Sequence, residues 1–173
     1  MRAPRARAST GPSTRRTSER TGLAVPAARL GQTGRVKIDD TDRCPCLSGD
    51  PYGRCCGLVH RGERVAPTAE ALMRSRYSAF VALDGDYLKR SWHPSTRPGS
   101  LSLDPDTRCL RLDIVRTWAG GPFDDAGEVE FRAIARDADG RYVLHEVSTF
   151  TREGGEWFYV DGVQMPGEPG QPS

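Results

Sequence analysis

The spacing of apolar residues predicts helices in the first part of residues 66–164 and strands in the second. Five apolar residues follow the three-and-four spacing of one helix face: Leu72, Met73, Tyr77, Phe80 and Val81. Thr68, directly after a proline, is of a residue type that caps helix starts. We therefore expect an amphipathic helix that begins at Thr68 and is interrupted at Gly85. A second, shorter helix is expected from Asp86 to Trp92, before the two prolines of HPSTRPGS.

Beyond Cys109 the period of the pattern changes to two, which is typical of half-buried strands. Apolar residues alternate with charged ones in two runs, Leu110, Leu112, Ile114 and Val129, Phe131, Ala133. Two further runs, RYVLHEVSTFTR and EWFYVDGVQ, are separated by Glu-Gly-Gly, which predicts a hairpin, and DADG predicts a turn before them. Helices followed by consecutive antiparallel strands predict an α+β fold, with the helices packed on one face of a curved sheet.

Composition changes this picture at both ends of the chain. Residues 1–36 carry eight arginines and one acid, Glu19, so the formal net charge of +2 for the whole chain leaves −5 for the rest. This segment has no apolar periodicity, and we expect a disordered basic tail over 1–36 and a second tail over the Pro- and Gly-rich residues 165–173. A transit peptide, a twin-arginine signal and a nucleic-acid arm are alternative interpretations of the basic tail.

Two of these interpretations, the twin-arginine signal and the nucleic-acid arm, lack a feature that they need. The basic tail has no hydrophobic segment of a secretory signal, and it has no aromatic residues that would stack on nucleic-acid bases. The sequence also lacks an apolar run of 18 residues, the length of a membrane-spanning helix. We therefore expect a cytoplasmic protein that binds neither a membrane nor a nucleic acid.

Four of the five cysteines fall within thirteen residues, CPCLSGDPYGRCC: Cys44, Cys46, Cys55 and Cys56. Tetrahedral zinc takes four thiolates, and two pairs of cysteines at the ends of a turning loop can converge on one ion. Disulfides are the alternative, but local bridges would be strained and only cross-pairing between the two pairs is comfortable. We therefore predict one structural Zn²⁺, with Arg43 and Arg54 beside the ligands. His60 is a further candidate ligand, although a packing role is favoured while four thiols are present.

This stretch resembles a SEC-C motif, the small zinc-binding module also found at the C-terminus of SecA. Its four cysteines match the metal positions, and Leu47 departs from the glycine that the family usually has there. Together with DYLKRSW and LHEVSTFTREGGEWFYVDG, it is similar in order and spacing to the YchJ-like family of bacterial proteins, over residues 43–163. The resemblance implies a SEC-C motif over 43–62, called the knuckle below, followed by an NTF2-like domain over 66–164. That fold encloses a conical cavity between its helices and its sheet.

The polar residues of LHEVSTF are the candidates for chemistry in this cavity. The strand pleat sets His145 and Glu146 on opposite faces, so only one of them can face the interior. Either could form an acid–base pair with Asp113, of the kind that NTF2-like enzymes use. Structural roles are favoured instead: an ion pair of Glu146 with Arg116 or Arg74, and a solvated His145. The residues expected around a pocket are Tyr77, Trp92, Trp118, Phe131 and Glu146.

The sequence lacks a phosphate-binding loop, a nucleotide fingerprint, H-E-x-x-H and a nucleophile elbow. Zinc held by four thiolates has no open position for water, which argues against metal catalysis. We therefore predict a binding or adaptor protein that is not an enzyme. Its knuckle would present Tyr52, Arg54 and Arg61 to a protein partner, as the SecA module contacts the export chaperone or the ribosome. The alternative is an NTF2-like small-molecule binder, isomerase or dehydratase that acts in the pocket.

Overall fold

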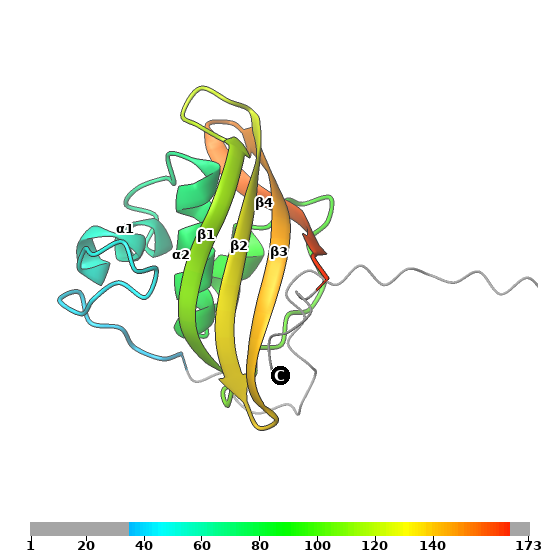
Figure 1. The fold of residues 1–173 in the computed structure, drawn as a ribbon. Helices are drawn as coiled ribbons and strands as arrows, with labels where there is room; N and C mark the ends of the chain where they lie inside the picture. The colour runs from blue at the N-terminus through cyan, green and yellow to red at the C-terminus, as the bar shows by residue number, and fades with distance from the viewer. Residues whose placement is uncertain (1–34, 167–173) are drawn as a thin grey trace, which may run out of the picture.

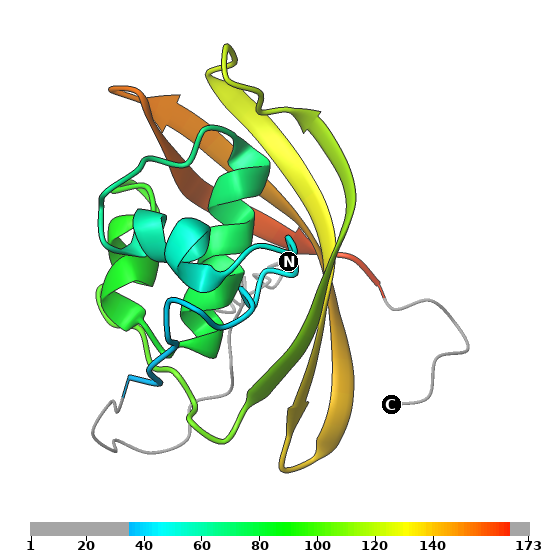
Figure 2. The ribbon, with the colours of Figure 1, turned by 90° about the vertical axis from the view of Figure 1, so that its left-hand side faces the viewer.

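A four-stranded antiparallel sheet with helices on one face forms the body of the protein in the computed structural model, which describes residues 35–166 (Figure 1). The strands pair in sequence order: β1 (Arg108–Ala119), β2 (Ala126–Asp137), β3 (Gly140–Glu153) and β4 (Glu156–Gln164). The sheet curves around α2 (Ala69–Val81) and α3 (Gly85–Arg90) (Figure 2). The knuckle, with the short helices η1 (Tyr52–Arg54) and α1 (Cys56–His60), packs against these helices. The predicted α+β fold is confirmed.

Helix α2 forms where the sequence predicts it and supplies one side of the core. The Thr68 hydroxyl accepts a hydrogen bond of 3.0 Å from the Ala71 N–H, which satisfies one of the free amides of the first turn. Leu72, Met73 and Tyr77 are buried against aromatic side chains of the sheet, which include Phe131, Phe150, Trp157 and Tyr159. Burial of this apolar face holds the helix on the sheet.

The second helix lies one to two residues earlier than predicted. Asp84 caps α3, because its carboxylate accepts a hydrogen bond of 3.0 Å from the Tyr87 N–H. The helix ends at Arg90, so Trp92 lies outside it and forms a bridge to Tyr159 of β4. The prolines of HPSTRPGS follow this bridge rather than ending the helix themselves.

The inward faces of β2 and β3 follow the predicted alternation. Val129 and Phe131 point into the core from β2, as do the three buried residues of β3, Glu146, Ser148 and Phe150. Strand β1 differs, because its register with β2 shifts between Cys109 and Arg111. This irregularity places Leu110 at the surface, where it is 48% exposed, and the predicted inward position of Leu110 is wrong.

Two residues assigned to the basic tail contact the body of the protein. The rest of that segment, 1–34, and residues 167–173 lie outside the described residues. The Arg35 guanidinium forms an ion pair with the Asp84 carboxylate, which is only 4% exposed. The Val36 N–H donates a hydrogen bond of 2.9 Å to the Ala82 carbonyl. The part of the chain that contacts the domain therefore begins no later than Arg35.

We expect removal of residues 1–34 to leave the melting temperature unchanged, and removal of residues 1–36 to lower it. The longer deletion takes the cation away from a buried carboxylate, which costs about 1–3 kcal/mol and shifts the melting temperature by about 5 °C or more. Differential scanning calorimetry of both truncated chains measures this.

The substitution Arg35→Gln in the full chain is the matched control and should reproduce the lower melting temperature. Burial opposes ionisation of Asp84, but hydrogen bonds from Arg35 and from the Tyr87 N–H outweigh it and lower the Asp84 pKa. The ion pair therefore stabilises the fold fully at pH values above the ordinary pKa of aspartate. This stabilisation is lost as the pH falls through the lowered pKa of Asp84. Equal melting temperatures of the two truncated chains at neutral pH would contradict the prediction.

Candidate metal centre and its surroundings

The four predicted ligand sulfurs converge at one point of the knuckle. The Sγ atoms of Cys44, Cys46, Cys55 and Cys56 all lie within 4.8 Å of one another. Those of Cys46 and Cys55 are 3.6 Å apart, and those of Cys55 and Cys56 are 3.9 Å apart. Tetrahedral zinc with bonds of about 2.3 Å separates its sulfurs by about 3.8 Å, so the donor set fits one four-coordinate ion. All five cysteines are free thiols, so the disulfide alternative is not formed.

Backbone hydrogen bonds bring the two cysteine pairs together. The Cys44 N–H donates to the Asp50 carbonyl at 3.0 Å, and the Tyr52 N–H donates to the Asp42 carbonyl at 2.8 Å. The chain turns between these bonds, where Leu47 has a φ of 61° and Gly49 a φ of 94°. Leu47 thus occupies the left-handed conformation at the position where the SEC-C family usually has glycine. This conformation costs a residue with a Cβ about 1–2 kcal/mol.

We expect Leu47→Gly to raise the free energy of unfolding of the metal-bound protein slightly, by up to about 1 kcal/mol. Relief of the left-handed strain outweighs the larger backbone entropy of glycine in the unfolded chain. Leu47→Ala retains the strain and serves as the control, with no gain expected. Chemical denaturation at saturating zinc measures both variants, and an equal effect of glycine and alanine would refute the explanation.

Arginines from outside the knuckle contact the carbonyls of two ligand residues. The Arg74 guanidinium, from α2, donates to the Cys46 carbonyl at 2.9 Å. The Arg64 guanidinium donates to the Cys55 carbonyl at 3.2 Å. Four thiolates and one divalent ion carry a net charge of about −2, which two nearby guanidinium groups partly offset. Arg43 and Arg54, which the sequence placed beside the ligands, are exposed.

His60 is not a metal ligand in this arrangement, because both of its ring nitrogens are used. Its Nε2–H donates to the Ser75 carbonyl of α2 at 2.8 Å, and its Nδ1 accepts from the Tyr52 hydroxyl at 2.8 Å. The ring also packs 4.3 Å from that of Tyr87. Burial lowers the pKa of His60 and favours the neutral form that this geometry requires. His60 therefore fixes the knuckle to the helices.

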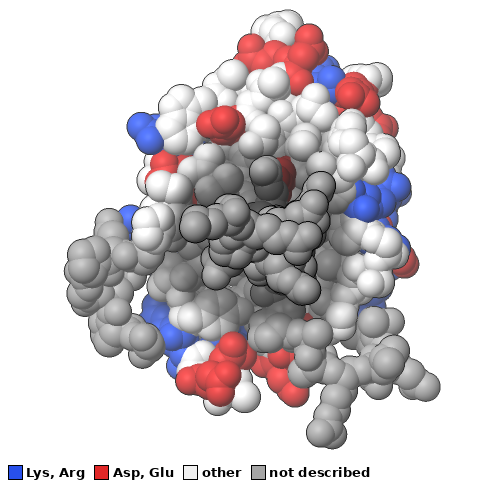
Figure 3. All heavy atoms as spheres, turned by 90° about the vertical axis from the view of Figure 1, so that its right-hand side faces the viewer, with Lys and Arg blue, Asp and Glu red and all other residues white. Residues whose placement is uncertain are grey.

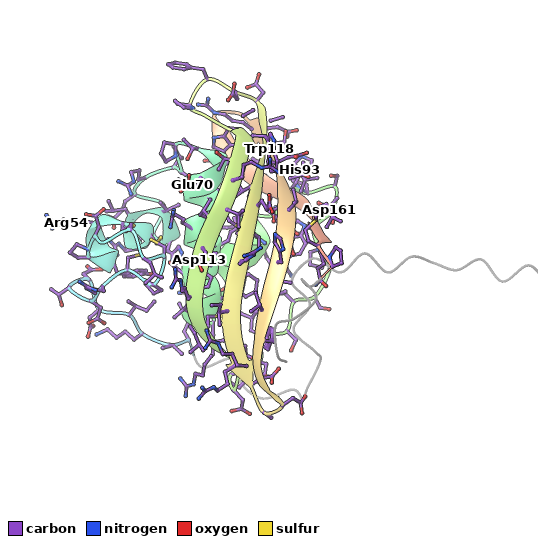
Figure 4. The ribbon with its side chains drawn as sticks, in the orientation of Figure 1. Arg54, Glu70, His93, Asp113, Trp118 and Asp161 are labelled. Atoms are coloured by element: carbon purple, nitrogen blue, oxygen red, sulfur yellow. The ribbon has the colours of Figure 1, made fainter. Side chains whose placement is uncertain are left out.

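Of the three residues predicted for a partner surface, Tyr52 and Arg61 are bonded within the protein, and Arg54 is the one whose side chain is available to a partner. Tyr52 is half-buried and its hydroxyl is bonded to His60, and Arg61 forms ion pairs with Asp40 at 3.0 Å and Glu63 at 2.7 Å. Arg54 lies at the end of the molecule away from the sheet (Figure 4). Leu47, which the sequence marked only as a departure from the motif, is 56% exposed on the same knuckle. We call Arg43, Leu47 and Arg54 the knuckle edge.

The predicted pocket residues do not surround one cavity. Tyr77 and Phe131 line a small apolar cavity of about 40 Å³ beneath α2. Trp118 is 37% exposed on the outer face of the sheet, where the Arg116 guanidinium lies 3.8 Å from its ring centroid. The prediction that Trp118 faces the interior is wrong, because a second register shift, between Ile114 and Arg116, reverses the pattern of β1.

Trp92 and Glu146 lie in a different part of the interior, beside a buried arginine that the sequence analysis missed. Arg76, 1% exposed, donates to the Leu88 carbonyl at 2.9 Å and to the Ser91 hydroxyl at 2.7 Å. Its guanidinium lies 4.4 Å from the ring centroid of Tyr159 and 5.1 Å from that of Trp92. Burial lowers the pKa of Arg76 to about 10, so it is still a cation at neutral pH.

Glu146 completes this buried group from the side of the sheet. Its carboxylate is fully buried and accepts a hydrogen bond of 2.6 Å from the Ser148 hydroxyl. A Cβ on Gly162 would overlap this carboxylate, so the close approach of β4 requires glycine there. We call Arg76, Trp92, Glu146 and Tyr159 the buried polar cluster.

Arg74 and Arg116, the partners predicted for Glu146, form ion pairs with other carboxylates. Arg74 pairs with Glu70 at 2.8 Å, and Arg116 pairs with Glu130 at 3.4 Å. These partners were misassigned because sequence spacing does not show which face of its helix or strand each arginine occupies.

Neither predicted acid–base pair with Asp113 forms. Asp113 contacts Arg111 at 2.7 Å, and the His145 Nε2 lies 2.8 Å from a carboxylate oxygen of Glu130. Glu146 points to the other face of the sheet, so His145 and Glu146 do lie on opposite faces as expected.

Two observations on the described residues concern nucleic acid and membrane as partners. Seen from the side opposite the knuckle, acidic and basic side chains both occur, without a broad area of one sign in the described part of that face (Figure 3). Within residues 35–166, no helix has the length and apolar character needed to cross a membrane.

Comparison with known proteins identifies both parts of the chain, the knuckle and the domain, and shows relatives of the whole. Residues 68–162 match the family described as YchJ, middle NTF2-like domain, and residues 41–58 match the SEC-C motif. The chain is 51% identical over 122 residues to a UPF0225 protein of Streptomyces coelicolor, covering 70% of this chain and 95% of that protein. It is 52% identical over 121 residues to a UPF0225 protein of Corynebacterium efficiens, covering 69% and 92%.

Two solved structures have a similar fold. A SEC-C motif containing protein from Rhodopseudomonas palustris superposes with a TM-score of 0.63 at 31% identity, covering 72% of this chain and 100% of that one. Another SEC-C motif containing protein, from Psychrobacter arcticus, gives a TM-score of 0.60 at 27% identity, covering 78% and 89%. The sequence resemblance stated above is therefore confirmed.

Proposed function

Because this chain belongs to the YchJ-like family of UPF0225 proteins, we propose that it is a cytoplasmic zinc protein that binds a protein partner through its knuckle. The zinc ion would be structural, held by Cys44, Cys46, Cys55 and Cys56. All four coordination positions of a tetrahedral ion are then taken by sulfur, which leaves none for water or substrate. The role of the ion is to hold the shape of the knuckle.

The observation that carries this proposal is the composition of the knuckle edge. Leu47 is 56% exposed and is held in a left-handed conformation that glycine would adopt with less strain. Arg43 and Arg54 are exposed on the same knuckle, and neither forms an ion pair with an acidic residue in 35–166. An exposed apolar side chain and two exposed cations on one small module favour a partner segment that combines an apolar residue with acidic ones.

The small cavity at the predicted pocket residues Tyr77 and Phe131 supports binding at the surface over chemistry at that place. The cavity beneath α2 has a volume of about 40 Å³, whereas pockets for small molecules usually have about 300–1,000 Å³. It is lined mainly by apolar side chains. A non-catalytic role therefore agrees best with the geometry.

The test is capture of a cellular partner by the tagged protein and by the double variant Leu47→Asp, Arg54→Glu. We expect the variant to lose roughly tenfold or more in affinity for the captured partner while its zinc content stays at one equivalent. Arg111→Glu, on the outer face of the sheet, is the matched control and should capture normally. Undiminished capture by the double variant would show that the knuckle edge is not the contact.

A second candidate function has an observation of its own, the buried polar cluster. The Trp92 Nε1–H is buried without a hydrogen-bond partner among the described residues, and its ring lies beside the cation of Arg76, on which the charge of Glu146 also acts. Convergent polar groups of this kind are typical of small-molecule sites. A compound that co-purifies with the protein and is lost in Glu146→Gln, as read by native mass spectrometry, would favour a binder or enzyme over the adaptor.

A further inference from the structure

A second, larger hollow lies where the knuckle meets the domain. The groove has a volume of about 250 Å³ and is bordered by the segment after α1, by α3 and by the start of β4. It is separate from the apolar cavity beneath α2, with which it shares no lining residue. We call it the junction groove.

The floor of the junction groove is apolar and largely aromatic. Ala66, Leu72, Tyr87 and Trp157 line it and are each less than 7% exposed, so they belong to the packed interior. A cavity of about 150 Å³ with apolar walls is large enough to hold benzene. The junction groove therefore has room for one ring or one branched alkyl group together with a short polar extension.

Two arginines with spare hydrogen-bond donors stand at its border. The Arg90 guanidinium donates to the His60 carbonyl and lies 4.6 Å from the Tyr87 ring centroid. Arg64 donates to the Cys55 carbonyl at 3.2 Å. Neither forms an ion pair with an acidic side chain among the described residues. A guanidinium has five N–H donors, so each retains donors for a further acceptor.

The charges at the border select the kind of anion. Glu156 also lines the groove, so its three charged side chains sum to about +1. This balance suits a monoanion better than a phosphate dianion. Guanidinium groups bind carboxylates with paired hydrogen bonds in a fixed geometry.

We propose that the junction groove binds a carboxylate that carries a compact aromatic or branched apolar group. The apolar group occupies the floor, and the carboxylate is held by Arg64 and Arg90. Two sources share this chemistry, a free small acid and the C-terminal residue of a peptide. The site is independent of the knuckle edge, since none of the residues of that edge lines it.

The experiment titrates the zinc-loaded full chain, labelled with ¹⁵N, with 3-phenylpropionate, with its neutral amide, and with N-acetyl-phenylalanine as the mimic of a peptide terminus. We expect a saturable shift of the Trp157 indole N–H signal with a Kd on the order of 1 mM or below, the range for a ligand of this size. The Trp118 signal, on the outer face of the sheet, should not move. The tighter of the two acids identifies the source.

Substitutions then assign the binding to the arginines. Arg64→Gln should weaken binding of the acid roughly fivefold or more, to the level of the amide, whereas Glu156→Gln should tighten it because a like charge is removed. Arg54→Gln, at the knuckle edge, should change nothing, which separates this result from the test of the partner surface. Equal binding of acid and amide, an unchanged affinity of Arg64→Gln, or no saturable shift of Trp157 with either acid would overturn the proposal.

Discussion

Replacing Cys46 with serine is expected to abolish stoichiometric zinc binding and to unfold the knuckle, while the sheet and α2 remain folded. Cys46 is completely buried, and its sulfur lies 3.6 Å from that of Cys55 at the centre of the cluster. Structural zinc in small modules contributes on the order of 10 kcal/mol of folding free energy, and the knuckle has little apolar core to replace it. Elemental analysis and ¹H–¹⁵N spectra measure the two effects.

Cys109→Ser is the matched control for this experiment. Cys109 lies on β1, away from the four clustered sulfurs, and burial raises its pKa to about 11, so it remains a thiol at neutral pH. The variant should keep one equivalent of zinc and lose only about 1–2 kcal/mol of stability from the buried hydroxyl. A full equivalent of zinc in Cys46→Ser, or its absence from the unmodified protein purified under reducing conditions, would refute the metal assignment.

Arg76→Ala is expected to be the most damaging single substitution in the domain, at about 3–5 kcal/mol. The change removes a fully buried cation from beside two aromatic rings and takes donors from the Leu88 carbonyl and the Ser91 hydroxyl. It also takes a cation from the neighbourhood of the buried Glu146, whose charge is one of those that act on Arg76. Urea denaturation measures the loss.

Arg111→Ala provides the comparison, because Arg111 also pairs with an acid but is 61% exposed. Exposed ion pairs contribute about 0–1 kcal/mol, so this variant should unfold almost as the original does. If both alanine variants lost the same small amount, the buried polar cluster would not stabilise the fold. These groups would then be candidates for a functional role.

The features that the sequence predicts well are those that depend on neighbouring residues. The Thr68 cap, the hairpin turn at Gly154 and Gly155 and the cysteine cluster all arise within a short stretch of chain. Such local chemistry constrains the backbone regardless of the rest of the fold. The family resemblance added the identity of the knuckle and of the domain.

The features that the sequence does not reveal depend on contacts between distant segments. The irregularities of β1 move Leu110 and Trp118 to the outside, and strict alternation cannot foresee a bulge. Arg74 reaches the Cys46 carbonyl across 28 positions. Arg76 lies on the buried side of α2 although arginine is rarely buried. A search for apolar residues at helical spacing therefore does not find it.

The hydrogen bonds around the knuckle bear on whether this motif can be moved to another protein. Three carbonyls of the knuckle, those of Cys46, Cys55 and His60, accept from arginines outside it: Arg74, Arg64 and Arg90. A peptide of residues 43–62 would carry all four cysteines but none of these donors, and the contact of His60 with Ser75 would also be missing. A transplant into a new host would therefore need matching arginines on the host. In this chain the boundary at residue 62 separates two stretches of sequence, but the knuckle depends on side chains that lie beyond it.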